Sequence, residues 1–218
     1  MKVFRDINRN IVLRGDFMSE KSSKEKIMEA AAQLFYYNGF KGTSIRAITD
    51  EANVNVSLIS YYFKNKQGLL EYMIVEYYEN YLKLLEELTV DEQALKEPKI
   101  FFKSIEEIIH YKYDHFQFTC FIQRELSLDN MFIRELFSTY VAKEKFLLEK
   151  MTHALASHYK INNQQMDVLY IQLKSLLNGP FVYVNDWQGD YQWDGTEKIF
   201  IKTYINTLSE WFFPQKNR

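Results

Sequence analysis

The stretch from Thr43 to Leu70 concentrates residues whose types and spacing suit a polyanionic partner. It reads TSIRAITDEANVNVSLISYYFKNKQGLL, with two adjacent tyrosines and two lysines that flank an asparagine. Tyrosine hydroxyls and lysine ammonium groups are common donors to phosphate oxygens. Small side chains ahead of the tyrosines, including Ser57 and Ser60, can approach base edges in a DNA major groove. These residue types therefore predict contacts to nucleic acid.

Two short helices joined by a tight turn are needed to position these side chains. Thr43 or Ser44 caps the first helix. Asn53 occupies the turn, because asparagine tolerates positive φ better than most residues. Asn55 then caps a second short helix, from Val56 to about Phe63.

A longer helix precedes this pair. Ser22 and Glu25 form a capping-box pattern ahead of apolar residues at helical spacing, and Asn38 and Gly39 stop the helix after about Tyr37. Three helices with a tight turn between the last two form a helix-turn-helix unit, whose last helix enters the major groove. The predicted DNA-binding residues are Thr43, Arg46, Val56, Ser57, Leu58, Ser60, Tyr61, Tyr62, Lys64 and Lys66.

This pattern resembles the DNA-binding domain of the TetR/AcrR family. The resemblance covers a capped helix ending in NGF, then GTSIRAI, then ANVNVSLISYYFKNKQGLL. The sequence departs from the family at Asn53, usually Gly, at Ser60, often Tyr, and at Gln67-Gly68, where acidic residues are frequent. Asn53 is conformationally equivalent, whereas Ser60 removes a bulky groove contact and changes the expected base specificity. The alternative is that Tyr61 and Tyr62 are partly buried core aromatics.

The composition favours an all-α fold. The chain has 218 residues, 47% hydrophobic and 17% aromatic, with only 7 Gly and 3 Pro to interrupt helices. We predict an N-terminal arm or extension at 1–18, a helix-turn-helix domain at 19–67 and a helical dimerisation and regulatory domain at 68–218. The further predicted helices cover 69–88, about 98–115, about 130–158, about 164–187 with a kink at Gly179-Pro180, and 196–213.

Charge and residue counts narrow the function. Residues 1 to 70 hold 11 Lys/Arg against 7 Asp/Glu, so the cationic end coincides with the predicted DNA-binding unit. The single Cys120 excludes an intramolecular disulfide, and the histidines at 110, 115, 153 and 158 lack metal-ligand spacing. Enzyme motifs are absent, so we expect no enzyme, cofactor or metal. No run of about 18 apolar residues predicts a membrane span, and we expect a cytoplasmic, nucleoid-associated protein.

The family resemblance implies a homodimer in which the last two helices of each subunit form a four-helix interface. The residues independently allow it, because the last helix carries an apolar stripe too wide for one partner helix. The alternative is that the stripe is intrachain core. Its members are Ile199, Phe200, Tyr204, Ile205, Leu208, Trp211 and Phe212.

Two classes of function remain. In the first, an effector binds inside the C-terminal bundle and releases an inverted repeat in DNA. In the second, DNA binding positions the protein, and another surface engages a protein partner. The whole chain also resembles a TetR-like regulator of spore-forming bacilli that binds chromosomal sites and opposes assembly of the division protein FtsZ. Two Arg-Glu-Leu triplets suggest a partner surface at Arg124, Glu125, Arg134 and Glu135, or else ordinary solvated ion pairs.

Overall fold

The structure is a computed structural model that describes residues 21–127, 131–159, 163–188 and 196–212. Every regular element in these ranges is a helix, which confirms the all-α prediction. Their order is α2 (Ser23–Gly42), α3 (Ile45–Glu51), α4 (Ser57–Phe63), α5 (Lys66–Leu88), the 3-10 turn η1 (Ala94–Lys96), α6 (Pro98–Asp114), α7 (Phe116–Ser127), α8 (Met131–Tyr159), α9 (Asn163–Val182), α10 (Val184–Gln188) and α11 (Thr196–Phe212).

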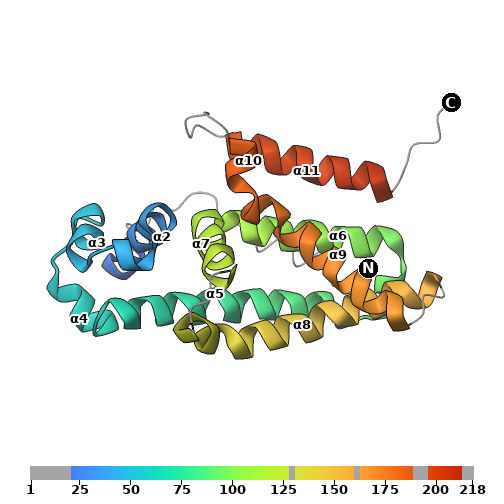
Figure 1. Cartoon of the computed structure of the whole chain (residues 1–218), viewed down its shortest axis with the longest axis horizontal. Coiled ribbons are helices and arrows are strands. Elements are labelled where there is room, and N and C mark those ends of the chain that lie inside the picture. Colours follow the sequence, from blue (N-terminus) through green and yellow to red (C-terminus); the bar gives the residue numbers. More distant parts are fainter. Residues whose placement is uncertain (1–20, 128–130, 160–162, 189–195, 213–218) are drawn as a thin grey trace.

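Helices α2, α3 and α4 lie at one end of an elongated molecule, which we call the short-helix end after α3 and α4. Figure 1 shows α2, α3 and α4 grouped there, with α5 running from α4 along the body beside α8. Helices α6 and α9 cover this pair, and α11 lies outermost, against α6. One long helix, α5, therefore connects the short-helix end to the bundle directly.

Local signals in the sequence set the bounds of α2. The Ser22 hydroxyl accepts a hydrogen bond from the Glu25 amide at 3.2 Å, and the Glu25 carboxylate accepts one from the Ser22 amide at 2.8 Å. The predicted capping box is therefore present. At the other end Gly39 has φ +70 and breaks the regular helix, as predicted, although helical structure resumes as far as Gly42.

The junction of α4 and α5 requires a glycine. Lys64 adopts φ +67, and the Asn65 side chain caps α5 by accepting a hydrogen bond from the Gly68 amide at 2.9 Å. A Cβ atom on Gly68 would lie 2.1 Å from the carbonyl oxygen of Phe63, so no other residue fits without moving the backbone. This close approach accounts for the glycine at position 68 of this chain.

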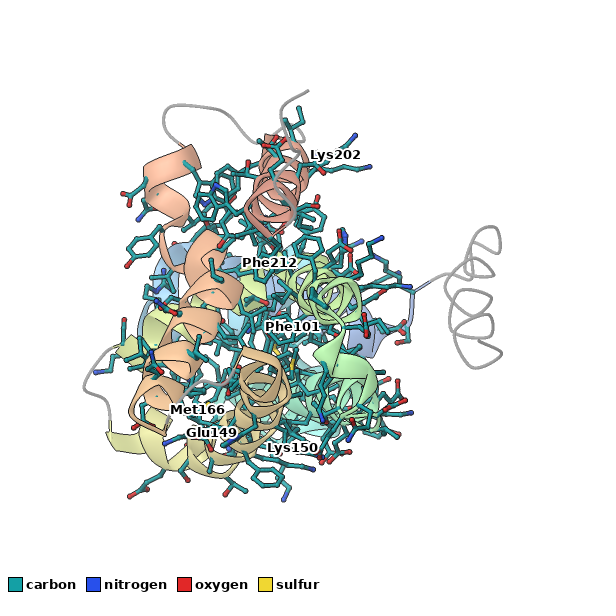
Figure 2. All side chains as sticks on the ribbon, turned by 90° about the vertical axis from the view of Figure 1, so that its right-hand side faces the viewer. Phe101, Glu149, Lys150, Met166, Lys202 and Phe212 are labelled. Carbon is teal, nitrogen blue, oxygen red and sulfur yellow. The ribbon has the colours of Figure 1, made fainter. Side chains whose placement is uncertain are left out.

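The last helices differ slightly from their predicted bounds. The helix predicted to reach Trp187 divides after Val182 into α9, which contains Pro180, and a separate short helix, α10. Figure 2 shows Phe212 of α11 beside Phe101 of α6, with ring centroids 6.3 Å apart, whereas Lys202 points away from the bundle. Helix α11 is therefore packed on α6 along one side.

The predicted apolar stripe of α11 is divided between two environments. Ile205 and Leu208 are buried in the core of the same chain. Ile199 and Trp211 are each 70% exposed. Part of the stripe is thus intrachain core, and part is available to another surface.

Candidate nucleic-acid interface

Helix α4 has one anchoring face and one exposed face. Ile59 and Phe63 are 1% and 4% exposed and hold the helix against α2 and α5. Their four-residue spacing leaves Ser57, Ser60 and Tyr61 on the outer side. Among the other predicted DNA-binding residues, Val56 and Lys64 are exposed and Leu58 is half-buried. The sequence therefore builds a helix that presents small and polar side chains outward.

The turn before α4 orients Ser57. Asn53 has φ +51, as predicted for the turn residue. The Asn55 side-chain oxygen accepts hydrogen bonds from the Ser57 amide at 2.9 Å and the Ser57 hydroxyl at 2.8 Å. The helix begins at Ser57, one residue after the predicted start. Because the hydroxyl hydrogen of Ser57 is engaged by Asn55, its oxygen faces outward as an acceptor.

The two adjacent tyrosines lie outside the core. Tyr61 is 78% exposed and Tyr62 is 38% exposed. Their rings meet edge to face with centroids 4.8 Å apart, and the Tyr62 ring lies 5.9 Å from that of Phe63. The interpretation of this pair as core aromatics does not fit these exposures.

Three residues around the start of α3 have different roles. Ser44, one of the two predicted caps, accepts a hydrogen bond from the Ala47 amide at 3.0 Å. Thr43 is 3% exposed, and its hydroxyl donates to the carbonyl oxygens of Leu34 and Gly39. The Arg46 side chain is 91% exposed and lies 3.9 Å from the Asp50 carboxylate. Arg46 is therefore placed to reach a phosphate, whereas the Thr43 side chain is turned inward.

Lys66 binds the end of α2. Its ammonium group donates to the carbonyl oxygens of Phe40 at 2.7 Å and Thr43 at 2.6 Å, and burial lowers its pKa. Both carbonyls follow the break at Gly39, and that of Phe40 also accepts a long hydrogen bond from the Thr43 amide at 3.5 Å. A phosphate contact by Lys66 stays a prediction, and such a contact would share the ammonium group with both carbonyls. The exposed Lys64 has the more accessible charge.

Arg124 of the predicted partner surface also binds α2. Its guanidinium donates to the carbonyl oxygens of Tyr36 at 2.9 Å and Phe35 at 2.7 Å. Glu125 is 8% exposed, and Glu135 is exposed on α8. The side chain of Arg134 lies outside the described residues. The structure thus places Arg124 between α7 and α2 and turns Glu125 inward, so the four residues are not shown on one common surface.

The centre of the bundle contains a buried charged group that the sequence patterns did not reveal. Lys112 of α6 is 1% exposed, and its ammonium group donates to the Asn178 side chain of α9 at 2.8 Å. It lies 3.9 Å from the Glu144 carboxylate of α8, which accepts a hydrogen bond from the Tyr81 hydroxyl of α5 at 3.0 Å. We call Tyr81, Lys112, Glu144 and Asn178 the central polar network.

Burial governs the charge of Lys112. It lowers the pKa of the Lys112 ammonium group to about 8, although the nearby Glu144 carboxylate opposes the shift. The sequence signal for this buried position is that Lys112 follows Ile109 and Ile108 by three and four residues, and so lies on the apolar face of α6. The network fills part of the bundle interior, where the first of the two classes of function would place an effector.

The described residues hold neither a metal-binding group of side chains nor a membrane-spanning helix. In residues 21–127, 131–159, 163–188 and 196–212, no group of three or more His, Cys, Asp or Glu side chains is arranged to hold a metal ion. Across the same ranges, no helix combines the length and apolar character needed to cross a membrane.

Comparison with known proteins places this geometry in a family. Residues 27–73 match the model described as "Bacterial regulatory proteins, tetR family". The chain is 35% identical over 190 residues to the "Probable HTH-type transcriptional regulator YttP" of Bacillus subtilis, covering 87% of this chain and 92% of that protein.

Solved structures share the fold at low sequence identity. A putative fatty acid metabolism regulator of Clostridium perfringens aligns with a TM-score of 0.67 at 17% identity, over 88% of this chain and 99% of its own. The transcriptional regulator FadR of Bacillus subtilis, solved in complex with stearoyl-CoA, aligns with a TM-score of 0.59 at 16% identity, over 84% and 96%.

The relative at 35% identity extends across both the short-helix end and the bundle. The homologues are transcriptional regulators, which points to a regulator and not to an enzyme. The exposed face of α4 lies within the matched residues 27–73. The chain belongs to the TetR family of bacterial regulatory proteins, which are DNA-binding helix-turn-helix transcriptional regulators.

Proposed function

We propose that this chain acts as a homodimer that binds an inverted repeat in double-stranded DNA, with α4 of each subunit in a major groove. The observation that carries the proposal is the outer face of α4, where the exposed Tyr61 stands beside Ser57 and Ser60 while Ile59 and Phe63 anchor the helix. The division into a DNA-binding unit at 19–67 and a dimerisation unit at 68–218 belongs to this proposal.

The dimer contact in this proposal uses α9 and α11. Both helices expose large apolar side chains, namely Val168 at 52%, Ile171 at 60%, Ile199 at 70% and Trp211 at 70%. The helices are neighbours, because the Tyr204 hydroxyl of α11 donates to the Leu176 carbonyl of α9 at 2.8 Å. Exposed apolar groups on adjacent helices are typical of an isologous interface.

A paired substitution tests the dimer contact. Ile171→Glu with Trp211→Glu should give a monomer by light scattering and weaken binding to an inverted repeat, since one subunit would then bind alone. The matched control is Phe146→Glu, an aromatic residue of α8 that is 62% exposed. A double variant that stays dimeric, with the control also dimeric, would rule out this surface.

A first candidate for the biological output is a RefZ-like role, in which a nucleoid-associated dimer regulates cell division through FtsZ. Two features support it: the resemblance of the whole chain to such a regulator, and the packed interior of the bundle, where Tyr81, Lys112 and Glu144 occupy the space that an effector would need. Among the described side chains of the predicted partner surface, Arg124 and Glu135 are exposed.

Purified FtsZ provides the test of this candidate. The dimer on its DNA site should slow FtsZ assembly followed by light scattering, and Glu135→Arg should reduce that effect without changing DNA affinity. Glu87→Arg, an exposed carboxylate on α5, serves as the charge-matched control. Assembly that proceeds equally with and without the dimer would eliminate this candidate.

A second candidate is a ligand-responsive repressor. It is supported by an open groove of about 750 Å³ between α2, α5 and the corner of α6 and α7. The fold is shared with a FadR protein bound to stearoyl-CoA, although at 16% identity that ligand does not transfer to this chain. If an effector exists, its site has to be argued from the groove itself.

A further inference from the structure

The groove lies where the short-helix end, which is the proposed DNA-binding end, meets the bundle. Its walls come from three parts of the chain: Met28, Glu29 and Ala32 of α2, residues of α5, and the α6–α7 corner. In Figure 1 these helices converge beside the start of α7. A volume of about 750 Å³ is within the range of small-molecule sites, roughly 300–1,000 Å³.

The floor of the groove is apolar and aromatic. Met73, Tyr77 and Phe118 line it, and each of these side chains is less than a tenth exposed. The rings of Tyr77 and Phe118 meet edge to face, with centroids 5.7 Å apart. Buried rings with a surface facing the groove offer both apolar contact and the negative face of a π system.

The rim of the groove is acidic. Glu29, Glu76 and Asp114 are exposed carboxylates among the lining residues, and His115 is the one basic side chain among them. Lys21 partly compensates Glu29, because its ammonium group lies 2.7 Å from that carboxylate. Asn80 and Gln117 add neutral polar groups to the lining. An anion would meet this rim at a cost, whereas a cation would be attracted from two or three sides.

We propose that this groove binds a lipophilic organic cation, whose apolar body packs on Tyr77 and Phe118 and whose charge lies near Glu76 and Asp114. The proposal deepens the ligand-responsive candidate and rests on it for the effect on DNA. Its site differs from the centre of the bundle, which the central polar network occupies.

A ligand here would act on the connection between the two ends. Arg124 joins α7 to the carbonyl oxygens of Phe35 and Tyr36 on α2, so these two hydrogen bonds hold α2 against the bundle. A ligand that contacts α2, α5 and α7 together stabilises the position of α2 in which it makes more contacts. Because α4 packs on α2 and α5, a change in the position of α2 changes the spacing between the two α4 helices of the proposed dimer.

Titration calorimetry of the full-length chain with two opposite ions tests the site. Tetraphenylphosphonium and tetraphenylborate have nearly the same shape and opposite charge. The cation should bind at one site per chain, and the anion should bind at least about tenfold more weakly. Equal binding of the two ions would mean that apolar contact alone is measured, and it would overturn the proposal.

Charge-matched variants locate the site. Glu76→Gln with Asp114→Asn should weaken cation binding about five- to tenfold, because two rim charges are lost. Glu79→Gln with Glu87→Gln removes the same charge from exposed positions of α5 outside the groove, and its affinity should match the wild type. All four residues are exposed, so both variants should fold, as circular dichroism would check. Equal weakening in both pairs would assign the effect to net charge and contradict the groove.

Measuring DNA affinity with and without the cation separates this proposal from the proposed function. Saturating tetraphenylphosphonium should change the Kd for an operator about 5- to 150-fold. If the chain binds no DNA, the proposed function fails while calorimetry still decides the groove. If calorimetry finds the site and the operator Kd does not change, the ligand-responsive candidate is contradicted.

Discussion

At the DNA-binding end, the helix caps are made by polar contacts local along the chain, whereas the central polar network of the bundle joins residues far apart in the sequence. Ser44, Asn55 and Asn65 each accept a hydrogen bond from an amide two or three residues ahead. In the bundle, Tyr81 reaches Glu144, and Lys112 reaches Asn178. One end is thus organised by short motifs, and the other by tertiary packing.

The two regions also differ in where their functional groups lie. The outer face of α4 exposes Ser57, Ser60 and Tyr61, whereas the central polar network is buried. Exposed side chains contribute little to stability, while a buried charge that loses its partner is costly. Substitutions on α4 should therefore change DNA affinity without changing stability, and substitutions in the network should change stability first.

The largest effect is expected from Tyr61→Ala with Tyr62→Ala. Loss of two phosphate donors should weaken binding to every DNA sequence by about 100-fold or more, because each hydrogen bond to a charged group contributes about 1.5–3 kcal/mol. Fluorescence anisotropy with several DNA duplexes measures the loss.

Phe146→Ala is the matched control for the tyrosine pair, since Phe146 is a 62% exposed aromatic residue of α8. It should keep wild-type affinity. Circular dichroism showing that the double-tyrosine variant is unfolded would contradict the assignment of both tyrosines to the surface.

The bundle side of the comparison is tested by Glu144→Gln. This substitution leaves Lys112 buried without its carboxylate and should lower the free energy of unfolding by about 3 kcal/mol. Adding Lys112→Met removes the stranded charge and should recover at least roughly half of the loss. Urea denaturation of the single and double variants gives both values. If the losses of the two single variants, Glu144→Gln and Lys112→Met, simply add in the double variant, Lys112 and Glu144 do not interact.

The pH dependence of stability should report the same buried lysine. Burial lowers the pKa of Lys112 to about 8, well below its value in the unfolded chain. Between pH 8 and about 10, the unfolded state therefore binds more protons than the folded state, and stability contributed by this group rises with pH. The free energy of unfolding of the wild type, relative to Lys112→Met, should increase over this window. A difference that stays flat would mean that Lys112 titrates normally.

The smallest effect is expected from Ser57→Ala. The hydroxyl of Ser57 donates to Asn55, so its oxygen can accept from adenine N6 or cytosine N4 but cannot donate to an acceptor. Removing it should relax the base preference at one half-site position by about 1 kcal/mol. Competition binding with all four base pairs at each position measures this, and a uniform loss at every position would instead indicate a phosphate contact.

Much of the DNA-binding end could be predicted from the sequence, because its signals are short. The Ser22 and Glu25 capping box, the break at Gly39 and the turn at Asn53 all depend on neighbouring residues, and all are present. Thr43 and Lys66 show where such patterns are insufficient. The Thr43 hydroxyl binds carbonyl oxygens of its own preceding helix, and the Lys66 ammonium group binds carbonyl oxygens that come close to it only when the chain folds.

The bundle was predictable as helices but not as a set of contacts. Apolar spacing indicated α6 and α8, yet it could not reveal that Lys112 and Glu144 meet inside. Arg124 is exposed, as its triplet suggested, but the triplet could not reveal that its guanidinium binds α2. Such contacts link residues from different helices, so only the folded chain brings them together.

The most direct test of the central claim is the affinity of the chain for an inverted repeat compared with a single half-site at the same salt concentration. The account predicts much tighter binding to the repeat, with half-site centres about 34–36 Å apart or slightly more, because two α4 helices enter successive major grooves. It also predicts a steep loss of affinity as salt rises, since phosphate charges are neutralised on binding. Equal affinity for the repeat and the half-site would contradict the claim that a dimer of this chain reads DNA through α4.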